Sequence, residues 1–207
     1  MPELSQLLVF FATSVLLALS PGPDNLFVMA QSVQNGRAAG LLVTLGLATG
    51  LVVHTLAVAL GLAALVQASS LAFTLLKFAG AAYLLYLAVK AFRSGGDSAV
   101  AADVPPDRVK LYRRGIIMNL SNPKVSLFFL AFLPQFADPA RGPVVPQLLL
   151  LGLVFIAATL LVFGTLSLLA GGAGERLRRS ERARTVINRV AGAVFTALAL
   201  KLVLAER

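Results

Sequence analysis

The stretch SPGPDN, residues Ser20–Asn25, interrupts an apolar N-terminal segment with two prolines, a glycine, a carboxylate and an amide. Proline has no main-chain N–H and clashes with the carbonyl four residues back, so a helix is expected to break here. In hydrocarbon, the carbonyls freed by a break need partners in the protein or in a water-filled cavity. The stretch therefore predicts a broken membrane helix whose break faces away from lipid. The alternative is a purely structural kink.

The composition places the rest of the chain in a membrane. Of the 207 residues, 58% are hydrophobic and 13% are charged, whereas about a quarter are charged in a typical soluble domain. The mean hydropathy is +0.86. Cysteine is absent and histidine occurs once, which argues against a disulfide framework, a thiolate nucleophile and a multi-histidine metal cluster. We expect an all-α polytopic membrane protein, and the N-terminus lacks the basic region of a cleaved signal peptide.

Six apolar segments are long enough to cross a membrane. They run approximately over Leu4–Val33 (broken at SPGPDN), Ala39–Val66, Leu71–Phe92, Gly115–Phe136 (broken at NLSNPK), Val144–Ala170 and Val186–Leu204. The whole chain, 1–207, is predicted to be a single transmembrane domain. A polar linker over residues 94–114 divides it into two halves.

The two halves share sequence features in the same order. The third segment reads KFAGAAYLLYLAVK from Lys77, and the sixth reads RVAGAVFTALALK from Arg189. The second and fifth segments share LGL, and the first and fourth both have a proline break. Because each half has three spans, an odd number, the second half is inverted relative to the first. Such a 3+3 inverted repeat, here over 1–93 and 115–207, is typical of secondary transporters whose discontinuous helices meet near the membrane midplane.

The net charge of +9 is distributed unevenly between the two faces that six spans define. Loops rich in Lys and Arg mark the cytoplasmic side of a membrane protein. One face receives Arg141 and Arg207, and the other receives Arg37, Arg93, Arg108, Lys110, Arg113, Arg114, Arg176, Arg178, Arg179, Arg182 and Arg184. The second face is predicted to be cytoplasmic, with both termini on the opposite side. This interpretation accounts for the basic balance without a nucleic-acid partner.

Asp24 is the one acidic residue that lies between apolar runs. A charge at membrane depth costs at least ~2.5 kcal/mol on insertion scales, and therefore marks a functional site by default. Asp24 is expected to bind a substrate ammonium group or to carry a proton. The alternative is that it caps a half-helix that begins at Leu26.

The second break, NLSNPK at residues 119–124, mirrors the first. At each break the following half-helix offers N–H groups and a positive dipole end to a carboxylate, and the preceding carbonyls suit an ammonium group. A zwitterionic amino acid matches this pair of ends. Lys124 would pair with Asp24, meet the substrate carboxylate or extend to the interface. The candidate substrate-binding residues are Pro21, Gly22, Pro23, Asp24, Asn25, Asn119, Asn122, Pro123 and Lys124.

Two further ionisable side chains join Asp24 as candidates for proton coupling. His54 shares a helical stripe with Gly46 and Gly50, and small residues mark close packing of membrane helices. Its imidazole is expected to face protein, either as a proton carrier or as a hydrogen-bonded core residue. Lys77 lies in the third segment on a face of small residues, and would point inward or extend to the interface.

No phosphate-binding glycine loop, Ser-His-Asp set or pair of buried carboxylates is visible in the sequence. We therefore expect no enzymatic activity, no cofactor and no bound metal, and transport energy from an ion gradient. A cation or metal-ion exporter is the main alternative, although hard divalent cations prefer several oxygen ligands. A membrane scaffold without transport is a third interpretation.

Three stretches of the sequence resemble the LysE/RhtB amino-acid exporters: SPGPDNLFVMAQSVQNGRAAGLLVTLGLATG, LLKFAGAAYLLYLAVKAFRSG and GIIMNLSNPKVSLFFLAFLPQF. The resemblance covers nearly the whole chain. It implies a bacterial inner-membrane protein that exports amino acids, driven by proton entry, with homo-dimerisation as an option. The single acid at membrane depth favours neutral substrates such as homoserine, threonine or leucine over basic ones. The pattern of the family falls on Pro21, Gly22, Pro23 and Asp24, and on Asn122, Pro123 and Lys124.

Overall fold

The computed structural model describes residues 2–20, 22–68, 107–169 and 181–204, together with residues 78, 81, 82, 85, 86, 88, 89, 92 and 93. These residues form helices, turns and short connections, and no strand occurs among them. The all-α prediction is confirmed. Pro21, Lys77, most of the third predicted span and residues 94–106 of the predicted linker lie outside the described residues.

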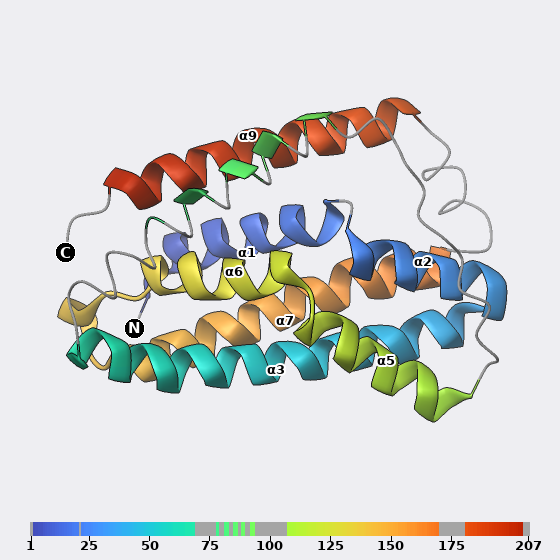
Figure 1. Cartoon of the computed structure of the whole chain (residues 1–207), viewed down its shortest axis with the longest axis horizontal. Coiled ribbons are helices and arrows are strands. Elements are labelled where there is room, and N and C mark those ends of the chain that lie inside the picture. The colour runs from blue at the N-terminus through green and yellow to red at the C-terminus, as the bar shows by residue number, and fades with distance from the viewer. Residues whose placement is uncertain are drawn as a thin grey trace.

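The described helices run along a common long axis (Figure 1). The first predicted segment forms α1 (Leu4–Leu19) and α2 (Pro23–Asn35), and the second forms α3 (Arg37–Ala68). The fourth forms α5 (Arg108–Leu120), α6 (Pro123–Ala131) and the 3₁₀ turns η1 (Leu133–Phe136) and η2 (Pro139–Arg141). The fifth and sixth form α7 (Val144–Leu169) and α9 (Glu181–Leu204).

Both predicted breaks interrupt a helix. The α1–α2 pair bends by 62° and the α5–α6 pair by 52°. Among the described residues, α3 and α7 are each long and apolar enough to cross a membrane, and each bent pair meets the same test as one span. The α1–α2 pair and the α5–α6 pair run in opposite directions, as do α3 and α7 (Figure 1). An inverted repeat requires these directions, and the repeat itself stays a prediction.

Local capping shifts two boundaries from their predicted places. Asp107 caps α5, where its carboxylate accepts from the main-chain N–H of Val109 at 3.0 Å and of Lys110 at 3.3 Å. The helix of the fourth segment therefore begins at Arg108, seven residues before the predicted Gly115. The second shift concerns α2, whose N-cap is Gly22 and whose first residue is Pro23. Proline suits this position because it has no N–H to leave unpaired.

Asp24 consequently lies inside the first turn of α2, and α2 does not begin at Leu26. The capping alternative for Asp24 is wrong. A carboxylate in the first turn still interacts favourably with the positive end of the helix dipole.

Glycines bring α3 and α5 into main-chain contact. A Cβ placed on Gly46 would meet the carbonyl of Tyr112 and would lie 3.0 Å from the Cα of Gly115. A Cβ on Gly115 would in turn lie 2.5 Å from the carbonyl of Val43. Small residues permit this approach between membrane helices. The predicted close-packing role of Gly46 is thus observed against α5.

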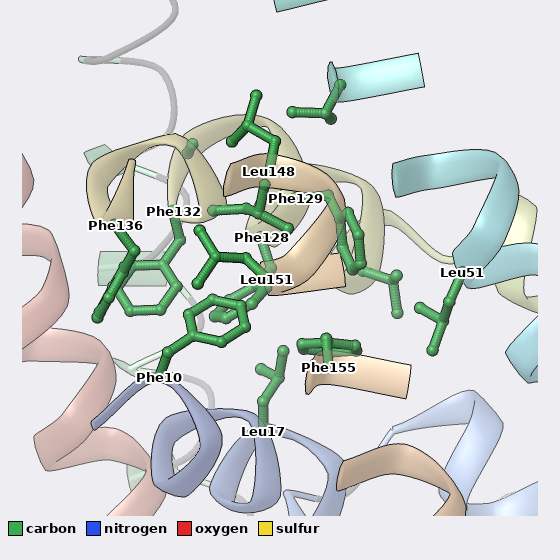
Figure 2. Close-up of a cluster of buried hydrophobic side chains, with 14 of the residues drawn as sticks. Phe10, Leu17, Leu51, Phe128, Phe129, Phe132, Phe136, Leu148, Leu151 and Phe155 are labelled. Atoms are coloured by element: carbon green, nitrogen blue, oxygen red, sulfur yellow. The ribbon is translucent and has the colours of Figure 1, made fainter. Parts of the chain in front are cut away.

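Two apolar clusters hold the helices together. The aromatic cluster contains Phe10 and Leu17 of α1, Phe155 of α7, Phe128 and Phe129 of α6, Phe136 of η1, and Phe132 between α6 and η1 (Figure 2). Its rings stack and tilt against one another; the centroids of Phe128 and Phe132, for example, are 4.6 Å apart. The second cluster, further along α1 and α7, contains Ala18, Phe27, Val28, Val43, Leu47, Leu111, Val162, Phe163 and Leu166.

Many large apolar side chains point away from both clusters. Leu8, Leu45, Leu153 and Leu161 are all more than half exposed. A soluble surface rarely presents so much apolar area, whereas lipid contacts it without cost. The exposed faces therefore agree with a membrane protein.

Candidate functional site

The two breaks meet in the interior of the helix bundle. At the end of α5, Asn119 donates from Nδ2 to Asp24 Oδ2 in α2 at 3.3 Å. In the first turn of α6, the Lys124 ammonium donates to the carbonyls of Leu17 at 3.0 Å and Ser20 at 2.9 Å. The structure thus brings Asp24, Asn119 and Lys124 to one junction, although they come from opposite halves of the chain.

Lys124 supplies a hydrogen bond that Pro21 cannot make. In an α-helix the N–H of each residue bonds to the carbonyl four residues earlier. Proline at position 21 has no N–H, and the carbonyl of Leu17 therefore loses its usual donor. Lys124 Nζ replaces that donor from the other half of the chain. Gly22 leaves room for the ammonium, because a Cβ there would lie 3.1 Å from Lys124 Nζ.

Pro23 has the same effect on the carbonyl of Leu19. Here the replacement donor is Asn25, whose Nδ2 reaches the carbonyls of Ala18 at 2.9 Å and Leu19 at 3.4 Å. Asn25 is buried. It therefore stabilises the break, and its amide nitrogen is engaged by α1.

Pro123 likewise removes a donor from the carbonyl of Asn119. That oxygen accepts from the N–H of Asn122 at 3.1 Å and lies 3.3 Å from His54 Nε2. Because a carbonyl oxygen can only accept, His54 must hold a proton on Nε2. His54 is half-buried and faces protein as predicted, here α5. Gly61, further along α3, has open space around it. Gly50, by contrast, packs directly on Asn119.

The junction contains unsatisfied polar atoms. Asp24, Asn119 and Asn122 are 6%, 2% and 3% exposed. Among the described residues, Asp24 Oδ1, Asn119 Oδ1 and Asn122 Nδ2 have no hydrogen-bond partner. Buried polar atoms are normally paired, so these three indicate a place where water or a polar ligand binds.

The other predicted site residues differ in their burial, and two of them are not described by the structure. Pro23 and Pro123 are exposed at the starts of their helices, and Gly22 is half-buried beside Lys124. Pro23 and Pro123 contribute to the junction because they have no main-chain N–H. Gly22 contributes because it has no side chain. Pro21 and Lys77 lie outside the described residues, and the proton-coupling role of Lys77 stays a prediction.

Sequence reasoning missed a second polar cluster between α2, α3 and α7. The hydroxyls of Ser32 and Ser167 both lie close to Gly40: a Cβ there would clash with Ser32 Oγ and would lie 2.6 Å from Ser167 Oγ. Gln31, which precedes Ser32 in the sequence, is fully buried. Neither Gln31 Nε2 nor Ser167 Oγ has a hydrogen-bond partner among the described residues. Gly40 was the available signal, since a glycine within an apolar helix often marks a close approach.

Broken helices that meet around a buried carboxylate, in a bundle of apolar helices, define a polytopic membrane transporter of the discontinuous-helix type. Within the part of the chain that the structure describes, no group of three or more His, Cys, Asp or Glu side chains could hold a metal ion. The fold and site thus give the class of protein but not its family.

Residues 15–206 match the LysE type translocator family, and the chain belongs to it. It is therefore a transporter and not an enzyme. The resemblance noted in the sequence is confirmed.

Curated relatives agree with this assignment over nearly the full chain. A homoserine/homoserine lactone efflux protein of Salmonella typhimurium is 35% identical over 90% of this chain and 90% of its own length. An uncharacterised membrane protein of Vibrio cholerae is 33% identical over 96% of this chain and 97% of its own. One from Bacillus subtilis is 28% identical over 94% of this chain and 97% of its own. No solved structure matches the chain.

Proposed function

We propose that the protein exports small neutral amino acids from the cytoplasm in exchange for protons, with homoserine, threonine and leucine as the substrates to test. The observation that supports this most directly is the junction of the two breaks, where one carboxylate, one ammonium and unpaired amide groups converge. Such a set suits the two charged ends of an amino acid. The Salmonella relative named for homoserine efflux supports the same class of substrate.

The coupling to protons would reside in Asp24. A carboxylate holds either a proton or the ammonium group of a substrate, because the proton removes the charge that attracts the ammonium. Proton entry from outside would therefore release the substrate, and proton loss to the cytoplasm would prepare the site again. His54 would be a neighbouring proton carrier, since its Nε2 contacts the main-chain carbonyl of Asn119 and the Asp24 carboxyl contacts the Asn119 side chain. Protons would pass between them through water, because the amide groups of Asn119 do not relay protons.

Alternating access would operate through the two apolar clusters. Along α1 the aromatic cluster ends at Leu17 and the second cluster begins at Ala18. Lys124 donates to the carbonyl of Leu17, so the junction lies beside the boundary between the two clusters, and a rearrangement of either cluster would open or close the path to it. On α2, Gln31 follows Asp24 by seven residues, or about 10 Å along the helix. The polar cluster around Gln31 would be the first binding site for a substrate that approaches from the C-terminal end of α2.

The orientation follows from the basic residues. The first residues of α3 and α5, Arg37 and Arg108, lie at the end of the molecule opposite to the start of α1 and the end of α9 (Figure 1). By the positive-inside rule that end faces the cytoplasm. We therefore place the protein in the bacterial inner membrane, with both termini on the periplasmic side.

The function can be tested by efflux from intact cells. Bacteria that lack other exporters are loaded with dipeptides of homoserine, threonine or leucine, and the released amino acid is measured by mass spectrometry with and without the protein. We expect protein-dependent efflux of at least one of them, and its loss on addition of a protonophore. Asp24→Asn should abolish efflux while the amount of protein in the membrane is unchanged.

Asp107→Asn is the matched control. It removes one exposed carboxylate far from the junction and keeps a good N-cap residue, so efflux should stay at the wild-type level. Wild-type efflux in Asp24→Asn would refute the role of Asp24. Efflux that survives the protonophore would refute the coupling to protons.

A further inference from the structure

We infer that the polar cluster around Gln31 is a separate site for the carboxylate of the substrate, and that it binds this group before the substrate reaches Asp24. The inference rests on the proposed export function and specifies which chemical group the first binding site recognises. The junction of the two breaks keeps the role proposed for it above.

The open hydrogen-bonding atoms of this cluster can donate. Asn35 Nδ2 donates to Gln31 Oε1 at 2.8 Å, so the nitrogen of the Gln31 amide is the end that stays open. Gln31 and Ser167 are both fully buried, and neither Gln31 Nε2 nor Ser167 Oγ has a hydrogen-bond partner among the described residues. An amide nitrogen only donates, and a hydroxyl can donate. A carboxylate has only acceptors and can pair with both atoms, whereas an ammonium has only donors and cannot pair with Gln31 Nε2.

The surroundings of this cluster also favour a negative charge. Helix α3 begins at Arg37, and Gly40 is the fourth residue of its first turn. The hydroxyls of Ser32 and Ser167 lie against Gly40, where a Cβ would clash with them. The cluster therefore lies beside the positive end of the α3 dipole, and Arg37 adds a positive charge to the same turn. Hydrogen bonds to an ionised acceptor are also stronger than those to a neutral one.

The cluster is distinct from the junction, although both lie along α2. Asp24, Val28 and Gln31 share one face of this helix, because residues four and seven positions apart lie on the same side. Val28, between the other two, is fully buried in the second apolar cluster. Gln31 Oε1 is bonded to Asn35, on the side of Gln31 away from Asp24. The ammonium and the carboxylate of an α-amino acid are attached to one carbon atom, so a substrate occupies the two sites in succession.

This arrangement orients the substrate as it enters. A molecule whose carboxylate is held by Gln31 and Ser167 keeps its ammonium group free. Asp24, on the same face of α2, then attracts that ammonium towards the junction. The first site therefore selects amino acids over amines and amino amides, which carry no carboxylate.

The test disables the junction and asks whether the carboxylate is still recognised. Asp24→Asn removes the charge that would hold the ammonium, and this variant is purified in lipid nanodiscs. Binding of radiolabelled threonine is measured by equilibrium dialysis, with threoninamide as the competitor. Threonine is suitable because the site recognises a group common to all α-amino acids, and threoninamide keeps the ammonium but has a neutral group in place of the carboxylate.

We expect saturable binding of threonine to Asp24→Asn. Threoninamide should compete roughly 10-fold more weakly, or worse, because it lacks the charged acceptor of the hydrogen bonds. Absence of saturable binding, or equal competition by threoninamide, would overturn the inference.

Two further changes, each added to Asp24→Asn, assign the binding to the cluster. Gln31→Met keeps the length of the side chain and removes its amide, and Ser167→Ala removes the hydroxyl. Each should weaken threonine binding by roughly 10-fold or more, and should bring the affinities of threonine and threoninamide closer together. If one variant does not fold, the other decides. Unchanged threonine affinity would make the cluster a site for water only, and equal weakening of both ligands would assign these side chains to packing; either result overturns the inference.

Matched controls are available for both changes. Gln34→Met alters an exposed glutamine on the same helix. Ser14→Ala removes a buried hydroxyl of α1 that donates to the carbonyl of Phe10. Neither control should alter the affinity for threonine.

The outcomes also separate this inference from the proposed function. Efflux of an amino acid from cells, together with no threonine binding to Asp24→Asn, overturns the carboxylate site alone. Absence of efflux of every amino acid tested overturns the export function, and the dialysis still decides whether the cluster binds a carboxylate.

Discussion

Gly46→Ala tests the helix contact that supports the junction. The added Cβ would meet the carbonyl of Tyr112 and the Cα of Gly115, which are main-chain atoms that cannot turn away. Helices α3 and α5 would have to separate, and overpacking of this kind costs about 1–3 kcal/mol. Alanine also favours the helix over glycine by about 1 kcal/mol. Gly61→Ala has the same helix gain and no neighbour within 4 Å.

The difference between these two variants isolates the contact. We expect Gly46→Ala to be less stable than Gly61→Ala by about 1–3 kcal/mol in reversible unfolding with SDS, followed by far-UV circular dichroism. Separation of α3 from α5 should also break the 3.3 Å contact between His54 Nε2 and the Asn119 carbonyl. The pH profile of efflux should then resemble that of a His54 variant. A stability equal to that of Gly61→Ala would refute the close contact between the two helices.

Three further predictions follow from single contacts. His54→Ala removes the donor to the Asn119 carbonyl and, with it, the proposed proton carrier, so it should change the pH dependence of efflux; an unchanged profile would assign His54 to packing alone. Asn25→Ala leaves two carbonyls of α1 without their side-chain donor, and should lower the free energy of unfolding by about 1–3 kcal/mol, measured by the same SDS titration. Arg141 lowers the pKa of Glu3 through a 2.7 Å ion pair, so its stabilising effect is present above the ordinary pKa of a glutamate and is lost as the pH falls through the lowered value. Arg141→Gln should therefore reduce the loss of stability between neutral and acid pH, and a loss equal to that of the wild type would contradict it.

The positions of the breaks could be predicted from the sequence because their cause is local. A proline lacks its N–H in any surroundings, so Pro21, Pro23 and Pro123 interrupt their helices whatever packs nearby. The long apolar segments were equally clear. The start of α5 could not be predicted, because its charged first turn resembles a linker. In the structure the carboxylate of Asp107 caps this turn and Leu111 is buried, so the turn is helical.

The partners at the junction could not be predicted for a different reason. Lys124 was expected to meet Asp24, a substrate or the interface, and these roles stay predictions. The bonds of its ammonium to the carbonyls of Leu17 and Ser20 were not foreseen. That pairing depends on how α6 lies against α1, which no local pattern specifies. The freed carbonyl of Leu17 was nevertheless deducible from Pro21, and a search for its donor would have pointed to a long polar side chain elsewhere.

The bond between Lys124 and the Leu17 carbonyl also has an evolutionary consequence. A family member with another residue at position 21 regains a main-chain N–H for that oxygen. A lysine at position 124 is then no longer needed as its hydrogen-bond donor. Substitutions at positions 21 and 124 are therefore expected to be inherited together across the family, even though about a hundred residues of chain separate the two sites.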